Sequence, residues 1–270
     1  MDHLLRDLAP ISAAGWAEIE SEASRTLKRT LAARRLVDFA GPQGWEAAAI
    51  GTGRSAPVTA PGGTQVHARK REVLPMVELR VPFEMSRREL EAIDRGAKDP
   101  DTDPVIAAAR GIALAEDRAI FYGLPDAGIQ GICTAQQSAA VTLDVAPDTY
   151  PGRIAVALNR LRDNGVDGPY AIALGESSYT ALTEATQGGY PVLEHVRRLV
   201  DGPLVWAPAL EGAVVLSLRG DDFLLTVGQD FSIGYLSHDV DTVKLYIEES
   251  FTFWLVSPQA AIPLALPAVG

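Results

Sequence analysis

The chain has 270 residues, of which 47% are hydrophobic, and a formal net charge of −11 at pH 7. This length can bury one large core or two smaller ones, and the acidic balance argues against a general nucleic-acid-binding protein, whose footprint is basic. The only cysteine, Cys133, excludes an internal disulfide framework. The start of the chain lacks the apolar core of a signal peptide, and no apolar run is long enough to span a membrane, so we expect a cytoplasmic protein.

The first predicted element is an amphipathic helix over residues 16–37. Its apolar residues recur at spacings of three and four, and basic residues fall between them. The apolar stripe comprises Trp16, Ile19, Ala23, Leu27 and Leu31. Such a stripe is typical of a helix packed on its own core, and it also allows a shared groove at the end of the helix.

Residues 47–72 predict an extended arm, because they are rich in Gly, Pro, Ser and Thr and show no helical period. Loops of this length are uncommon inside compact domains unless they are functional. The arm carries a basic patch, His67, Arg69, Lys70 and Arg71. This patch could bind a phosphate backbone, but in so acidic a chain pairing with carboxylates of a neighbouring subunit is favoured.

The arm leads into a predicted strand over 73–85, a short helix over 86–95 and a longer helix over 104–121. Asp103 followed by Pro104 is a typical helix start, with an N-cap and then proline in the first turn. Residues 132–220 form a separate α/β pattern, with helices near 154–161, 177–185 and 191–200 and strands over 170–174 and 213–218.

The stretch over residues 242–255 alternates apolar and polar side chains with a period of two, the pattern of an extended strand. Glu249 interrupts the apolar face, so it needs a partner or a place at an edge. A strand this long requires a long partner, and the alternating run at 73–85 provides one about 160 residues earlier. This pairing predicts a body interrupted by an inserted domain.

The sequence offers no recognisable enzyme, so we predict no catalytic residue and no metal ligand. The four histidines have no metal-ligand spacing to each other or to the cysteine. Ser237, His238 and Asp239 are the three residue types of a triad, but neighbours on a strand point apart instead of converging.

Many blocks of the chain, in one order, resemble the encapsulins, the shell proteins of bacterial nanocompartments. These blocks include LAPISAAGWAEIE, ARRLVDFAGPQGWE, LRVPFEMSRRELEAIDRGAKD, GYPVLEH, LVDGPLVWAPAL and GQDFSIGYLSHDVDTVKLYIEESFTF.

The resemblance implies an α+β fold of the tailed-phage major-capsid type. In that fold a peripheral domain comprises residues 1–46, 73–131 and 221–270, an extended loop residues 47–72, and an axial domain residues 132–220. It also implies self-assembly of about sixty copies or a small multiple into a closed icosahedral shell. Such a shell encloses a cargo enzyme, such as a dye-decolourising peroxidase or a ferritin-like protein, held by a C-terminal targeting peptide. We expect no specific nucleic acid and no membrane as partners.

Two sites follow from the resemblance. The cargo-peptide site is Leu27, Leu31, Arg34 and Asp38 on one wall, with Phe231, Ile233 and Tyr235 on the other. The five-fold pore is lined by Glu184, Thr186, Gln187, Gly188, Gly189 and Tyr190. Some encapsulins stack a flavin on a tryptophan where this chain has Arg88, so no flavin or other cofactor is predicted. Two alternatives remain: a phage-type major capsid protein with the same fold, and a cytosolic enzyme with an unrecognised site.

Overall fold

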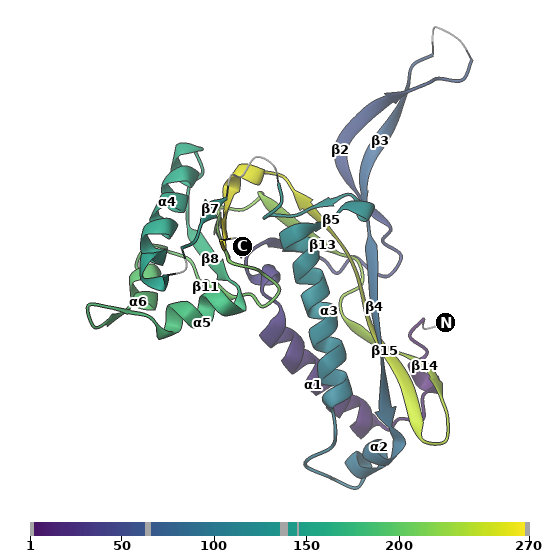
Figure 1. The fold of residues 1–270 in the computed structure, drawn as a ribbon. Helices are drawn as coiled ribbons and strands as arrows, with labels where there is room; N and C mark the ends of the chain where they lie inside the picture. The colour runs from purple at the N-terminus through teal and green to yellow at the C-terminus, as the bar shows by residue number, and fades with distance from the viewer. Residues whose placement is uncertain (1–2, 63–65, 136–139, 145, 268–270) are drawn as a thin grey trace.

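The computed structural model describes residues 3–62, 66–135, 140–144 and 146–267. It consists of an elongated body, a second lobe beside it, and a hairpin arm that projects from one end of the body (Figure 1).

The body is built on a five-stranded sheet whose longest strand is β15 (Thr242–Leu255). β15 pairs antiparallel with β4 (Val77–Ser86) from Phe251 opposite Val77 to Thr242 opposite Ser86. It also pairs with β13 (Phe223–Val227) and β14 (Ser232–His238), and β1 (Asp38–Ala40) lies parallel to β13. The predicted pairing of two distant alternating runs is therefore confirmed.

The strand predicted over 73–85 is two strands, not one. β3 (Ala68–Pro75) belongs to the arm and β4 to the body. Between them the N–H of Met76 donates to the carbonyl of Ala48, at the base of the arm. Pro75 has no N–H to continue a ladder, which explains why the strand breaks there.

Three helices cover the body sheet: α1 (Ala13–Thr30), α2 (Arg87–Asp94) and α3 (Asp103–Tyr122). α1 and α3 lie side by side, and their apolar faces form one core with the alternate residues of β15 (Figure 1). The Ser12 hydroxyl caps α1 by accepting the N–H of Gly15 at 3.0 Å.

The helix predicted over 16–37 starts earlier and ends earlier than expected. It stops at Thr30 because the next residue, Leu31, is extended, and a short 3-10 turn, η2 (Ala33–Arg35), follows. The buried carboxylate of Asp117 accepts the N–H of Ala32 at 2.9 Å and that of Ala33 at 3.0 Å. Because Asp117 of α3 accepts both N–H groups, the chain can leave the helix at this point without burying an unpaired backbone donor.

The second lobe holds a five-stranded sheet in the order β11 (Leu204–Trp206), β8 (Tyr170–Leu174), β12 (Ala213–Ser217), β16 (Ala261–Ala265) and β7 (Val141–Thr142). Its helices are α4 (Tyr150–Asp163), α5 (Glu176–Glu184) and α6 (Val192–Arg197). The sequence assigned 221–270 to the peripheral domain, but β16 pairs with β12 and β7 in the other lobe. By its pairing, the segment 261–265 belongs with 132–220.

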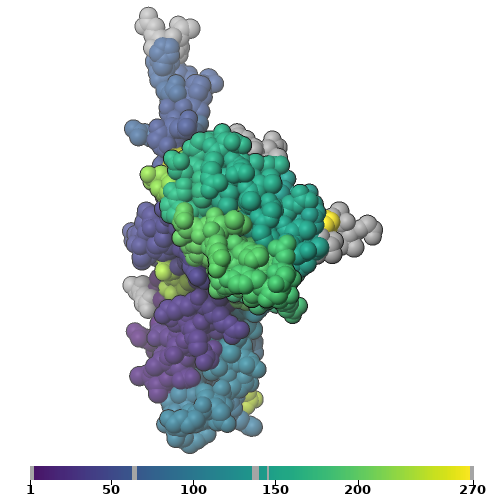
Figure 2. Space-filling model, turned by 90° about the vertical axis from the view of Figure 1, so that its left-hand side faces the viewer, coloured from purple at the N-terminus to yellow at the C-terminus, as the bar shows by residue number. Residues whose placement is uncertain are grey.

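The arm is an antiparallel hairpin of β2 (Ala49–Val58) and β3. Of the residues described between Ala49 and Pro75, none is buried. Figure 2 shows the arm as a narrow projection that stands clear of both lobes. Its side chains therefore add almost nothing to the core of their own chain.

The remaining elements are short. They are η1 (Arg6–Leu8), η3 (Pro125–Ala127), η4 (Pro147–Thr149), η5 (Pro258–Ala260), and the two-residue strands β5 (Gly123–Leu124), β6 (Ile129–Gln130), β9 (Thr186–Gln187) and β10 (Tyr190–Pro191).

Candidate functional site

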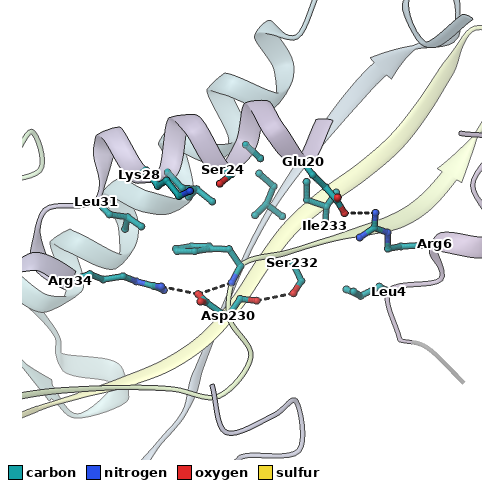
Figure 3. A pocket seen from close by; sticks show the side chains of 14 residues that line it. Leu4, Arg6, Glu20, Ser24, Lys28, Leu31, Arg34, Asp230, Ser232 and Ile233 are labelled. Carbon is teal, nitrogen blue, oxygen red and sulfur yellow. Dashed lines mark hydrogen bonds and ion pairs between the residues drawn. The ribbon is translucent and has the colours of Figure 1, made fainter. Parts of the chain in front are cut away.

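A groove of about 420 Å³ lies between α1, β14 and the N-terminal segment (Figure 3). Its surface is mainly apolar along the middle and charged at both ends. The lining residues are Leu4, Arg6, Glu20, Ala23, Ser24, Leu27, Lys28, Leu31, Arg34, Asp230, Phe231, Ser232, Ile233 and Ile247.

Arg34 closes one end of the groove and is held by acids from three elements. Its Nη2 lies 2.6 Å from Glu116 and 3.0 Å from Glu249. Its Nη1 lies 2.8 Å from Asp230 (Figure 3). The guanidinium also lies 4.4 Å from the ring centroid of Phe231. Burial would by itself lower the pKa of Arg34, but the hydrogen bonds and charges of Glu116 and Asp230 outweigh it and raise this pKa above its usual value.

The other end of the groove is closed by the N-terminal segment. The N–H of Tyr235 in β14 donates to the carbonyl of Leu4 at 2.8 Å, so this segment lies along the strand. Arg6 forms an ion pair with Glu20 of α1 at 2.5 Å (Figure 3). Its guanidinium also stacks over the ring of Trp16, 4.1 Å from the ring centroid. Three separate parts of the chain therefore enclose the groove.

Five of the seven residues expected at the cargo site line this one groove: Leu27, Leu31, Arg34, Phe231 and Ile233. The other two lie outside it. Asp38 accepts the N–H of Asp221 at 2.7 Å, and the hydroxyl of Tyr235 bonds to Nδ1 of His238 at 2.6 Å.

The six residues expected at the pore lie on the exposed hairpin between α5 and α6, together with the end of α5. Gly188 and Gly189 have φ of 59° and 82°, which suits a two-residue hairpin turn that glycine adopts without strain. The ring of Tyr190 stacks on His195 with centroids 5.0 Å apart, and Arg198 donates to its hydroxyl at 2.9 Å. This hairpin projects from the far end of the second lobe (Figure 1).

The remaining candidates from the sequence have ordinary places. Asp239 accepts the N–H groups of Asp241 and Thr242 in the turn before β15, while His238 bonds to Tyr235, so these side chains form no triad. Arg88 lies exposed on α2. Within the described ranges, no group of His, Cys, Asp and Glu is arranged to hold a metal, and no helix could cross a membrane.

Comparison with known proteins decides the family. A family model described as "Encapsulating protein for peroxidase" matches residues 1–252. The type 1 encapsulin shell protein of Rhodospirillum rubrum is 55% identical, over 98% of this chain and 96% of that protein. The chain belongs to the encapsulin family. A second such shell protein, from Rhodococcus erythropolis, is 49% identical over 98% of this chain and 100% of its own length.

Solved structures show the fold of this encapsulin. A virus-like particle from Pyrococcus furiosus matches with a TM-score of 0.64 at 17% identity, covering 92% of this chain and 98% of its own. A structure of Gordonia phage Cozz matches with a TM-score of 0.56 at 13% identity, covering 87% and 85%. The α+β, phage-capsid type of fold expected from the resemblance is therefore confirmed.

Sequence reasoning missed the N-terminal wall of the encapsulin groove and half of its helical wall. Three polar groove residues lie four positions apart on α1: Glu20, Ser24 and Lys28. The predicted helical stripe left them out because it was defined by apolar residues alone. A helical spacing of four joins these residues to one face, and that signal would have found them. Nothing in the sequence indicates that Leu4 and Arg6 return to α1.

The carboxylate of Asp117 fixes the turn that carries Arg34 to the groove, and this gives a stability prediction. Asp117→Ala orphans two buried N–H groups, each costing about 1–3 kcal/mol, so we expect the free energy of unfolding to fall by about 2–6 kcal/mol. Urea denaturation should show a lower midpoint than that of the native chain. Asp126→Ala, at an exposed position in η3, is the matched control and should change stability by less than about 0.5 kcal/mol. Equal midpoints for the two variants would contradict this role.

Proposed function

We propose that this encapsulin assembles into a closed icosahedral shell of about sixty copies, or a small multiple, around a cargo enzyme. The observation that carries the proposal is the arm, which has no buried residue of its own among those described. A hairpin of this length gains stability only by covering a second copy. The names of the relatives, all type 1 encapsulin shell proteins at 47% to 55% identity, support the same conclusion.

The domain roles follow from this assignment. The body comprises residues 1–46, 73–131 and 221–270 without β16, and it serves as the peripheral domain. Residues 47–72 serve as the extended loop, and residues 132–220 with β16 as the axial domain around the five-fold axis. The shell is a compartment of the bacterial cytoplasm, and the role of the chain is structural and not enzymatic.

Negative-stain microscopy of the purified protein tests the assembly directly. We expect hollow particles of uniform size. Compact particles of one or a few chains would overturn the proposal and favour an enzyme. Particles filled with nucleic acid would favour a phage-type capsid protein instead.

We further propose that the groove binds a short targeting peptide of the cargo, for which the family description names a peroxidase. A disordered tail must offset its ordering cost by burying apolar anchors, and the middle of the groove offers Leu27, Leu31 and Phe231, all partly exposed. Two or three buried aliphatic side chains contribute about 1.5–3 kcal/mol each before that cost. A cargo with several tails then gains further affinity by binding several sites of one shell.

The hairpin between α5 and α6 gives a prediction on permeability. A ring of Glu184 around a five-fold axis favours cations, while Arg198, which donates to the hydroxyl of Tyr190 on the same hairpin, limits the effect. Glu184→Lys should slow entry of a cationic substrate into loaded shells, and speed entry of an anionic one, on the order of tenfold. The initial rates of a peroxidase enclosed in the shell, measured with a cationic and with an anionic substrate, report both effects.

Glu211→Lys makes the same charge change at another exposed position of the second lobe and serves as the control. If cations and anions enter Glu184→Lys shells at the same rates as they enter native shells, Glu184 does not line the pore.

A further inference from the structure

Behind the groove, three carboxyl groups surround the single guanidinium of Arg34. Glu116 of α3 and Glu249 of β15 are 0% and 1% exposed, and they approach Arg34 from inside. Asp230, whose side chain is 43% exposed, approaches from the groove side. If all three were ionised, two buried negative charges would share one cation with a third nearby.

Such an arrangement is costly unless one acid keeps its proton. A buried charge without a full set of partners loses its hydration and gains too little in return. The Oε1 of Glu249 is buried and has no hydrogen-bond partner among the described residues, whereas the carboxylate of Glu116 accepts Nε and Nη2 of Arg34 in a forked pair. Glu249 is therefore the acid that holds the proton. Burial first, and the adjacent charge of Glu116 second, raise the pKa of Glu249 well above its usual value.

The other charged groups around this cluster do not neutralise it. Asp117, next to Glu116, uses its two oxygens for the N–H groups of Ala32 and Ala33. Burial, partly offset by those two bonds, raises the pKa of Asp117 to about 7. On the opposite face of β15, Glu248 is bound by Arg80 and His3. Arg34 is thus the cation that faces Glu249.

The protonation state of Glu249 sets the balance of forces on Arg34. While Glu249 is neutral, the guanidinium is shared between Glu116 inside and Asp230 outside, and it stays against Phe231 at the groove end. When Glu249 ionises, a second buried anion attracts the guanidinium inward and repels Glu116, so water must enter. The contact of Arg34 with Asp230 and Phe231 is then weakened.

We propose that Glu116 and Glu249 are positioning residues for the groove, and that the proton on Glu249 holds Arg34 at the groove end, so that peptide affinity falls as the pH rises. This inference rests on the proposed binding of a cargo peptide. Because the pKa of Glu249 is raised, the folded chain binds this proton more tightly than the unfolded chain does. The contribution of the proton to the free energy of unfolding is therefore complete below the ordinary pKa of Glu. It is lost as the pH rises through the raised value.

Two measurements on assembled shells, made from about pH 6 to about pH 9, test the inference, since documented buried Glu groups titrate in this range. The first is hydrogen exchange in the segments 34–36 and 230–233 of empty shells, corrected for intrinsic rates, which leaves out the two N–H groups that Asp117 holds. The second is fluorescence anisotropy of a labelled peptide that comprises the C-terminal segment of the peroxidase from the same genome. In native shells we expect faster exchange in both segments and about tenfold weaker binding at the alkaline end.

Glu249→Gln keeps an acceptor for Arg34 and fixes the neutral form. It should bind the peptide as tightly as the native shell does at low pH, with no dependence on pH. Glu84→Gln, an exposed carboxyl paired with Lys244, is the matched control and should follow the native profile. If Glu249→Gln does not fold, the native profiles decide by themselves.

The inference is overturned if exchange and affinity in native shells do not change with pH, or if Glu249→Gln keeps the native pH dependence. A peptide that binds at no pH would overturn the proposed cargo site instead. In that case the exchange profiles still decide whether the proton positions Arg34.

Discussion

Shells of the double variant Leu27→Asp, Leu31→Asp are expected to form normally and to remain empty. Leu27, on α1, and Leu31, the first residue after α1, both line the groove and are partly exposed. A bound aliphatic anchor therefore loses about 1.5–3 kcal/mol at each position. The combined loss of at least about 3 kcal/mol weakens binding by more than a hundredfold, since each 1.4 kcal/mol is about tenfold. The measurement is the amount of co-expressed tagged peroxidase that purifies with the shell.

The choice of these two positions depends on burial. Ile233 also lines the groove, but it is only 6% exposed and packs in the core with Ile19 and Leu245, so a charge there would unfold the chain. Leu236→Asp is the matched control, because Leu236 lies on the same strand as Ile233 but is 47% exposed and lies outside the groove. Normal loading of the double variant would place the cargo site elsewhere. Failure to form shells would show that Leu27 and Leu31 are core residues.

Shortening the arm is expected to abolish assembly while leaving the chain folded. The variant replaces residues 53–71 by Asn-Gly, joining Thr52 to Glu72 just beyond the pair Gly51–Val73. Asn-Gly favours the tight turn that this register requires. Because the described residues of the arm bury nothing in their own chain, we expect native circular dichroism, a monomer or small oligomer in size-exclusion chromatography, and no particles by microscopy.

Charge gives this prediction a second readout. Between Ala49 and Pro75 the sequence has four Lys or Arg and one Glu, in a chain of net charge −11. An arm that docks on an acidic neighbour is weakened by salt, because surface charges are screened within about 10 Å at 0.1 M. Lys70→Glu with Arg71→Glu should therefore raise the protein concentration needed for assembly. Full-sized shells from the shortened chain would contradict the docking of the arm on a second copy.

The sequence predicted the elements whose apolar period is uninterrupted, and it missed those set by a distant partner. The pairing of β15 with β4 followed from two alternating runs, and the break at Glu249 correctly called for a partner. That partner is Arg34. The sequence placed Arg34 at the cargo site and not beside the buried Glu249, because it does not indicate which way Glu116 or the end of α1 faces. The stop of α1 at Thr30 depends on Asp117, about 85 residues away, so no local pattern contains it.

The groove shows the same limit. Leu27 and Leu31 were found by resemblance and lie on the predicted stripe. Leu4 and Arg6 were not found, because a short N-terminal segment has no period and is placed by contacts with distant residues, such as the hydrogen bond from Tyr235 to the carbonyl of Leu4. β16 was missed because its five residues contain a proline and do not alternate. Its place is decided by the neighbouring strands β12 and β7, which are distant in sequence.

The position of β16 also fixes an order of events during synthesis. This strand is an inner strand of the sheet in the second lobe, between β12 and β7, yet it comes after β15 of the body in the chain. Domains fold as units while the chain emerges from the ribosome, N-terminal parts first, but a sheet that lacks an inner strand cannot close. A nascent chain therefore keeps this lobe incomplete until β15 of the body and then β16 have both been synthesised.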